Sequence, residues 1–437
     1  MIGLFATRRR LGLGFGVGLA LLSAGCQGSM APPENLQVAI ATGAGNDAVV
    51  RSSLRQLSGQ MVQEFMRVHP GTNLHLRFLE EHELVESVRS RASLGAGPDL
   101  MITRTAPLAR LEREGLLRQS SLGSNQLAPF QIQFLNNFRQ ANRYRALPFL
   151  LQPGLACFDR RRLPKPPANL DDLVARAAEG VRLGLPLQAD ELLWTASGFN
   201  ADRPLLQLFQ DQVGTAQAKP SPAAAPTVER KALTAEQKAN LLGWLNWLYQ
   251  ANIQPTLQFV DTSDELVQRL ESRQFDWISC NATAIPRLKR ALGANLGVSV
   301  LPAGNAGQPA RPLARLLLIG FGRDSTPSQA RLAESFALFV LNDFSQSNLI
   351  MKALGNMPVN QNVIVPVKDS PYLAAMETSL KSSTVPNFNL GVGLRQRTDP
   401  LRQLLKKNVY GEAKPQAVLA AMETLAGSSS STPAQQR

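Results

Sequence analysis

Few residues of this chain stand in arrangements that could carry out catalysis. Gly43, Gly45 and Ala48 follow an apolar run and match a loose G-x-G-x-x-A pattern, which cradles a pyrophosphate in dinucleotide-binding enzymes. That chemistry also requires an acidic residue about 20 positions further on, and Glu80 and Glu81 come too late. We therefore interpret the stretch as a loop leading into a helix whose N-terminus faces a ligand.

Nucleophilic and metal-assisted chemistry are not indicated either. The sequence holds no G-x-S-x-G turn. His69, His75 and His82 fall in one short stretch without partners at metal-ligand spacing, and none is placed to serve a serine or cysteine nucleophile. The carboxylates of "LEEHE" come where a helix begins, and there they complement the helix dipole. We therefore predict neither an enzyme nor a metal or cofactor site.

The N-terminus indicates export. "TRRRLGLGFGVGLALLSAGC" contains three arginines, an uncharged run over 11–25 and then Cys26. The run is shorter than the roughly 20 residues of a membrane span, and the order is that of a secretory signal peptide. Its end resembles the lipobox of bacterial lipoproteins, and its start also resembles a twin-arginine signal, so the export route stays open. We predict a signal peptide over 1–25, a lipid on Cys26 and a tether over 26–35, which would anchor the body outside the cytoplasm.

Two cysteines remain, and each lies in an apolar, strand-like stretch: Cys157 in "GLACF" and Cys280 in "FDWISC". In an oxidising compartment they could form a disulfide. As buried free thiols they would act as small apolar side chains. We interpret them as free thiols and keep the disulfide as the alternative.

Composition limits the class of protein and of partner. A chain of 437 residues is long enough for two domains, and no later stretch is apolar for long enough to span a membrane. The formal net charge is +13, and three of the arginines lie in the predicted signal peptide, which leaves +10 for the remainder. These basic residues are scattered, which favours a solvated surface, an anionic membrane or an acidic ligand over a nucleic acid.

Hydrophobic periodicity predicts an α/β fold. Apolar runs over 36–41, 74–79 and 98–102 alternate with stretches of helical spacing, which indicates a parallel, wound sheet. Two further strand-like runs lie within 144–158.

Later segments carry capping and low-complexity signals. Asn169 is placed to cap a helix, and Thr234 and Gln237 are placed to form a capping box. The Pro- and Ala-rich stretch 213–232 is predicted to be a flexible insertion, and 427–437 a disordered tail.

The order of these elements is similar to that of a known family. The chain resembles the extracellular solute-binding proteins of ABC importers, in the group that includes the maltodextrin-binding protein, from about residue 36 to 426. The resemblance is carried by "QEFMRVHPGTNLHLRFLEE", "GAGPDLMITRTAPLARLEREGLL", "LPFLLQPGLACFDRRRLPKPP", "GVSVLPAGNAGQPARPLARLLLIGF" and "ALGNMPVNQNV", in that order.

The resemblance implies a two-lobed periplasmic-binding-protein fold of type II. Each lobe would be a wound α/β sheet, and the ligand would bind in the cleft between them. We expect lobe 1 to comprise 36–147 and 284–322, and lobe 2 to comprise 148–283 and 323–426. Closure of the lobes around the solute would let a membrane permease recognise the loaded monomer.

The family's maltodextrin-contacting residues are largely replaced here. The matching positions hold Thr103 and Ala106 after the third strand, Gln152 in the crossover and Leu394 near the end, and only Trp194 matches a sugar-stacking tryptophan. A long glucan is therefore not expected.

A smaller polyhydroxyl ligand stays compatible with the residues present. An aromatic plane can pack on a sugar ring, amides and hydroxyls can bond its hydroxyl groups, and an arginine can bind a carboxylate or phosphate. Each candidate has a structural alternative: a turn residue for the asparagines, a core residue for the tryptophan and a surface charge for the arginine. Trp244, Trp247 and Trp277 are interpreted as core. The candidates are Thr42, Asn46, Arg104, Gln152, Trp194, Asn281 and Asn356.

The sequence thus predicts a lipid-anchored substrate-binding subunit of an ABC transporter that captures a small carbohydrate or similar polar solute. Two alternatives stay open. The same fold could bind an anionic solute or an osmolyte, which Arg104 and the net charge favour. The chain could also be an assembly lipoprotein without a solute, which the replaced sugar-contacting residues favour. A hydrolase is the remotest alternative.

Overall fold

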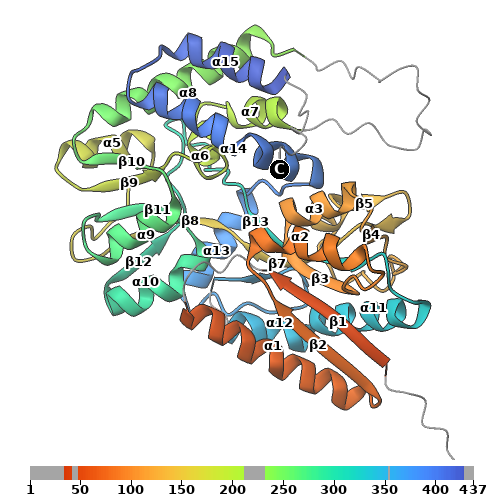
Figure 1. The fold of residues 1–437 in the computed structure, drawn as a ribbon. Coiled ribbons are helices and arrows are strands. Elements are labelled where there is room, and N and C mark those ends of the chain that lie inside the picture. The colour runs from red at the N-terminus through yellow and green to blue at the C-terminus, as the bar shows by residue number, and fades with distance from the viewer. Residues whose placement is uncertain (1–33, 42–47, 211–231, 353–354, 428–437) are drawn as a thin grey trace, which may run out of the picture.

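A computed structural model describes residues 34–41, 48–210, 232–352 and 355–427. The predicted signal peptide, Cys26 and the loop with Thr42 and Asn46 lie outside these described residues, as do nearly all of the predicted insertion and tail. Within the described ranges, no helix has both the length and the apolar character needed to cross a membrane. Two sheets, each covered by helices, form two lobes, which we call lobe 1 and lobe 2 (Figure 1).

In the sheet of lobe 1, the first strand of the chain lies next to an edge strand. Its strands are β1 (Glu34–Ala41), β2 (Thr72–Phe78), β3 (Leu100–Arg104), β4 (Leu117–Arg118), β7 (Leu147–Gln152), β13 (Arg315–Gly322) and β14 (Met357–Pro358). The order is β14-β7-β13-β3-β1-β2, and β4 also pairs with β13. β1 is parallel to β2 and β3, as the alternating strand and helix pattern predicts, because parallel neighbours need a helical crossover.

Helices cover both faces of this sheet (Figure 1). One face carries α2 (Glu81–Ala92) and α3 (Thr105–Arg113), and the other carries α1 (Ala48–Val68), α11 (Pro327–Leu341) and α12 (Asp343–Lys352). The ring of Phe65 on α1 packs edge-on against Phe336 on α11, with centroids 5.1 Å apart. A small extension before β7 comprises α4 (Ile132–Asn136), β5 (Arg139–Gln140) and β6 (Arg143–Tyr144).

Lobe 2 holds the second sheet, in the order β10-β9-β11-β8-β12. One face is covered by α9, α10 and α13, and the other by α5, α6 and α8, with α7, α14 and α15 outside α8 (Figure 1). The strands span Leu257–Val260 (β10), Leu183–Pro186 (β9), Trp277–Asn281 (β11), Gly154–Asp159 (β8) and Leu296–Ser299 (β12). The helices span Leu170–Ala178 (α5), Ala189–Ser197 (α6), Asp202–Phe209 (α7), Ala235–Ile253 (α8), Ser263–Glu271 (α9), Ile285–Leu292 (α10), Pro371–Ser382 (α13), Phe388–Val409 (α14) and Pro415–Gly427 (α15), with short 3-10 turns at Ala282–Ala284 (η1) and Gly293–Asn295 (η2).

The predicted capping residues and core tryptophans are confirmed. The Asn169 side chain accepts from the backbone N–H of Asp172, and Thr234 and Gln237 cap each other at the start of α8. Trp244, Trp247 and Trp277 are buried, and the indole N–H of Trp244 donates to the Thr195 hydroxyl at 2.9 Å. Local sequence signals therefore identified the helix starts and the inner face of α8 correctly.

The chain passes between the lobes at places other than those expected. It first leaves lobe 1 at Pro153, between β7 and β8, so the expected boundary at 148 falls inside a strand of lobe 1. Residues 285–299 include α10 and β12 of lobe 2, and residues 327–352 and 357–358 include α11, α12 and β14 of lobe 1. These boundaries depend on which distant strand each segment pairs with, and local periodicity does not carry that information.

Helix α14 belongs to both lobes. At its start, Phe388 packs edge-on against Phe138 of lobe 1 with centroids 5.0 Å apart, and the Arg145 guanidinium lies 5.1 Å from the same ring. Further along, Leu401 and Leu405 are buried in the core of lobe 2. The buried residues on the α10 and α13 side of the second sheet also join the core of lobe 1 in one continuous cluster.

The interpretation of Cys157 and Cys280 as free thiols is wrong, because the two residues form a disulfide. Cys157 on β8 lies opposite Ile278, and Cys280 on β11 lies opposite Leu155, so the cysteines are diagonal neighbours on adjacent antiparallel strands. Their Cα atoms are 5.9 Å apart, within the range that a disulfide spans. The strands are 123 residues apart in sequence, so only the three-dimensional register reveals the pair.

A partly buried ion pair joins the residues just before β9 and β11 in lobe 2. Asp276 accepts from the backbone N–H and the guanidinium of Arg182, at 3.0 Å and at 2.6 Å and 3.1 Å. Burial alone would raise the pKa of Asp276, but the bonds from Arg182 outweigh it and hold that pKa below its usual value. At a pH above the pKa of the unfolded chain, about 3.9, such a carboxylate stabilises the folded protein. This contribution is lost as the pH falls from that value through the lower pKa of the folded protein.

We expect Asp276→Asn to lower the free energy of unfolding at pH 7 by about 1–2 kcal/mol, a value discounted because Arg182 is partly exposed. The difference from the wild type should shrink as the pH falls below about 4, because the carboxylate of the unfolded chain takes up a proton there before the folded one, whose pKa is lower, does so. Urea denaturation at pH 7 and pH 3 measures both effects. A difference that stays constant between these pH values would contradict the ion-pair explanation.

Candidate functional site

Polar residues gather where the carboxyl ends of the two sheets meet. Gln152 ends β7 and Arg104 ends β3, and Arg315, the first residue of the antiparallel β13, lies between them as the register partner of Gln152. In lobe 2, Asn281 ends β11, and Glu191 follows β9 in the first turn of α6. In wound α/β sheets this edge is the usual place of ligand binding.

Amide side chains join the lobes beside the first crossing. The Gln152 amide donates to Asn356 Oδ1 at 2.9 Å, and the Asn281 amide donates to the backbone carbonyl of Gln152 at 3.2 Å. Gly355 has φ +96° and leaves room for the backbone of η1, because a Cβ here would lie 2.4 Å from the carbonyl of Ala282. Glycine tolerates both this φ and this approach. Three predicted site residues, Gln152, Asn281 and Asn356, are thus brought together.

A charged cluster lies next to the amides. A nitrogen of the Arg104 guanidinium lies 3.3 Å from the Glu81 carboxylate, both in lobe 1. The Arg315 guanidinium of lobe 1 donates to one oxygen of Glu191 in lobe 2, and the hydroxyl of Ser263, at the start of α9, donates to the other oxygen. These four charged side chains are only 15–26% exposed, so the cluster bridges the lobes in a largely enclosed position.

Burial and close neighbours shift the pKa values of this cluster. Burial, and then the positive charge of Arg315, lower the pKa of Arg104. Burial would also lower the pKa of Arg315, but the carboxylates around it, Glu191 first, outweigh burial and raise it. Burial raises the pKa of the Glu191 carboxyl, and Arg315 partly opposes that shift. The site is therefore one in which charges are poorly hydrated and depend on each other.

Some buried polar atoms near the two clusters have no hydrogen-bond partner among the described residues. They include Gln152 Oε1 on β7 and the hydroxyl of Ser279 on β11, on side chains that are 4% and 7% exposed. Buried polar groups are normally bonded, to protein, water or a ligand. The interlobe region therefore offers acceptor and donor groups in addition to its charges.

Two solved structures with the same architecture were determined with bound carbohydrate ligands. A cyclo/maltodextrin-binding protein complexed with maltotetraose superposes with a TM-score of 0.73, at 15% identity, over 93% of this chain and 99% of its own. The GacH receptor of Streptomyces glaucescens GLA.O, studied unliganded and with acarbose and an acarbose homolog, gives 0.69 at 16% identity, over 90% and 97%. No protein-family profile matches the sequence, and no curated protein matches it significantly.

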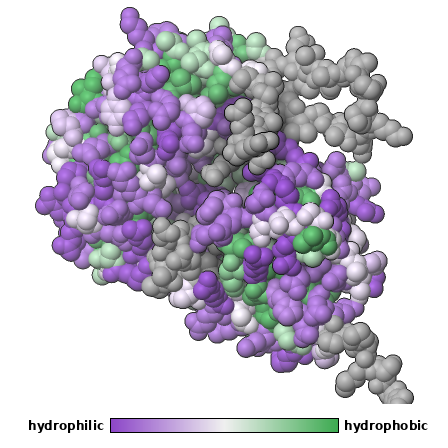
Figure 2. Space-filling view, viewed as in Figure 1, coloured by the Kyte–Doolittle hydropathy of each residue, from purple (hydrophilic) through white to green (hydrophobic). Residues whose placement is uncertain are grey.

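The chain has the two-lobed fold of these binding proteins. The fold expected from the sequence is thereby confirmed. The described residues include the sheets and helices of both lobes. Figure 2 shows hydrophilic side chains predominating on this face of both lobes.

Within this binding-protein fold, the predicted site residues separate into three groups. Arg104, Gln152, Asn281 and Asn356 lie between the lobes, whereas Thr42 and Asn46 follow β1 outside the described residues. Trp194 is 2% exposed and lies in the core of lobe 2, with its ring 6.4 Å from that of Trp277. This placement is that of a core side chain.

Sequence reasoning missed Glu81, Glu191, Ser263 and Arg315. Glu191 and Ser263 stand in the first turn of helices that follow strands β9 and β10, and Arg315 precedes a long apolar run. Position just after a predicted strand was a usable signal for Glu81, which follows the run 74–79, but the strands before Glu191 and Ser263 were not predicted. Arg315 could not be found in this way, because β13 is antiparallel to its neighbours and presents its amino end at the site.

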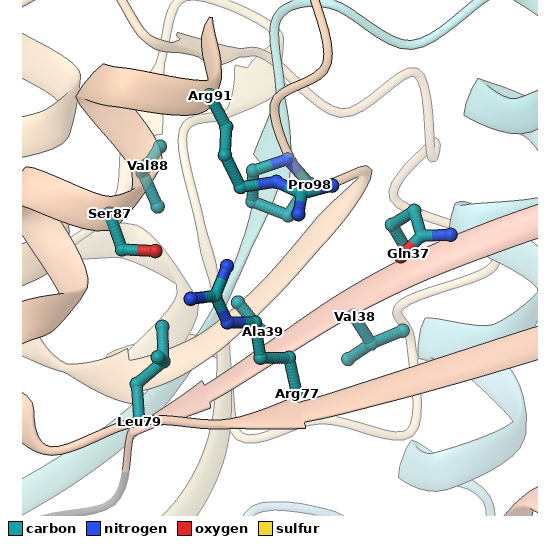
Figure 3. A pocket seen from close by; sticks show the side chains of 9 residues that line it. All are labelled: Gln37, Val38, Ala39, Arg77, Leu79, Ser87, Val88, Arg91 and Pro98. Atoms are coloured by element: carbon teal, nitrogen blue, oxygen red, sulfur yellow. The ribbon is translucent and has the colours of Figure 1, made fainter.

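A pocket in lobe 1 lies apart from the interlobe region, between α2 and strands β1 and β2. Arg77 and Arg91 extend into it from opposite sides, beside the Ser87 hydroxyl (Figure 3). Its volume, even with open solvent space included, is about 290 Å³, below the roughly 300–1,000 Å³ of ligand pockets. We do not assign it to the solute. The described residues also hold no group of three or more His, Cys, Asp or Glu side chains that could bind a metal.

Proposed function

We propose that the chain is the extracytoplasmic solute-binding subunit of an ABC importer and that it binds a small carbohydrate or related polyhydroxyl solute between its lobes. The observation that carries the proposal is the meeting of polar residues from both sheets at their carboxyl ends, in a fold shared with sugar-binding proteins. A solute held there would contact both lobes at once, and its binding would favour their closure.

The amide cluster supports a neutral, hydroxyl-bearing solute. Gln152 Oε1 is buried with no hydrogen-bond partner among the described residues and could accept from a solute hydroxyl, while Arg104 and Glu81 add donors and acceptors to the interlobe region. The guanidinium of Arg104 faces Glu81 and that of Arg315 faces Glu191. Because each positive charge has a carboxylate next to it, the site gives less support to an anionic solute than the sequence did.

The proposed location follows from the N-terminus. A signal peptide over 1–25 and a lipid on Cys26 would hold the protein at the outer face of a membrane, where permease subunits would be its partners. The Cys157–Cys280 disulfide fits an oxidising compartment. We propose that the anchored protein acts as a monomer without a cofactor or catalytic turnover.

A thermal-shift screen against sugars, polyols, osmolytes and small anions tests the proposal. A solute that binds only the folded protein raises the melting midpoint in proportion to the logarithm of its concentration. We expect a neutral sugar or glycoside to give this shift, and Gln152→Ala to weaken its affinity about tenfold or more, because one buried hydrogen bond is lost.

Gln133→Ala is the matched control, because Gln133 is exposed on α4 and should leave the affinity unchanged. A shift with anions alone, unaffected by Gln152→Ala, would overturn the carbohydrate proposal in favour of the anionic alternative. No shift across the panel would favour the assembly lipoprotein.

A further inference from the structure

Lobe 1 and lobe 2 are joined by an ion pair whose two residues belong to different lobes. Arg315 begins β13 of lobe 1, and Glu191 lies in the first turn of α6 in lobe 2. Neither residue contributes to the strand order of the other's sheet. The contact therefore exists only while the lobes stand in this relative position.

Both ends of the pair are fixed by their surroundings. The register of β13 between β3 and β7 places Arg315 at the sheet edge, opposite Gln152. In lobe 2, the Ser263 hydroxyl of α9 donates to the second oxygen of Glu191, so both carboxylate oxygens are bonded. A pair that is positioned by its own lobes loses little side-chain freedom when the lobes meet.

Neighbouring charges have complementary signs across the interface. From lobe 1, Arg104 and Arg315 outnumber Glu81, whereas lobe 2 contributes Glu191 with Asp190 and Asp264, all close enough to act on the arginines. Charges of opposite sign on facing surfaces attract, and more strongly where water is largely excluded. The Glu191 and Arg315 side chains are 15% and 26% exposed.

From this geometry we infer that the Arg315–Glu191 pair is a closing contact, which sets the balance between open and closed lobes. The inference deepens the proposed function, since closure is the step that would hold the solute. Removing the charge of either residue leaves the other partly buried and unpaired in the closed form, and opening exposes it to water. Each single substitution should therefore shift the population toward open lobes.

Small-angle X-ray scattering of the purified chain, without added solute, tests this inference with Glu191→Gln, Arg315→Gln and the double variant. We expect each single variant to reduce the ratio of closed to open molecules about tenfold or more, seen as a larger radius of gyration. The double variant should open no further than the single variants, because direct partners are not additive.

Glu334→Gln is the control. Glu334 accepts from Arg118 at 2.7 Å, and both residues lie in lobe 1, so this variant should lose stability without opening the lobes. Near-UV circular dichroism would confirm that each variant is folded. If Glu191→Gln does not fold, Glu191→Asp replaces it; this variant keeps the charge on a shorter side chain and should open the lobes to a smaller degree.

Unchanged scattering from folded Glu191 and Arg315 variants would overturn the inference, as would equal opening by Glu334→Gln. Because no solute is present in the scattering experiment, this outcome would not contradict a solute found in the thermal-shift screen. A failure of every solute to bind would in turn leave the scattering result unaffected.

Discussion

Reduction of the Cys157–Cys280 disulfide is expected to lower the free energy of unfolding by about 4–5 kcal/mol. The bond closes a loop of 123 residues, and a cross-link over a loop of that length removes a large part of the unfolded chain's conformational freedom. Urea denaturation with and without a reducing agent measures the difference. The effect should be large because β8 and β11, which the bond connects, are central strands of lobe 2.

The Cys157→Ala, Cys280→Ala double variant is the control for this experiment. It should unfold near the midpoint of the reduced wild type and should not respond to the reducing agent. Equal stability of the oxidised and reduced wild type would show that the loop closure does not contribute, and would contradict the expectation.

Trp194→Ala is expected to lower the free energy of unfolding by about 3–5 kcal/mol, through loss of packing in the core of lobe 2. The side chain is 2% exposed and packs near Trp277, and its indole nitrogen has no hydrogen-bond partner among the described residues. The loss is therefore one of apolar contact rather than of a polar bond. Equilibrium denaturation in urea gives the value.

Trp194→Phe separates a core role from a solute-stacking role. It should keep most of the packing, cost less stability than the alanine variant, and bind the solute as the wild type does. If Trp194→Ala instead costs less than about 1 kcal/mol and selectively abolishes solute binding, then the ring contacts the solute, as the sequence resemblance implied.

The sequence predicted the features that depend on neighbours along the chain. The parallel order of β1, β2 and β3 followed from alternating periodicities, and the cap at Asn169 followed from residue types at fixed offsets. Gln152 and Asn281 were predicted as ligand-binding residues, which stays a prediction; the structure brings them together because each ends a strand at the same interface.

The features that were missed depend on pairing between distant segments. The disulfide required the register of β8 against β11, and the lobe boundary at Pro153 required the pairing of β7 with β13. The Arg315–Glu191 contact joins residues 124 positions apart in different lobes. Trp194 matched an aromatic position of the resembled family, but the burial of α6 decides what its ring touches.

Helix α14 has a consequence for the cooperativity of unfolding. Its Phe388 end is held in lobe 1 and its Leu405 end in lobe 2, and one apolar cluster continues from the core of lobe 1 to a face of the second sheet. Neither lobe can unfold without exposing apolar surface that the other lobe buries. The two lobes therefore have separate sheets but form a single unit for unfolding, so the stability of a variant in one lobe is a property of the whole chain.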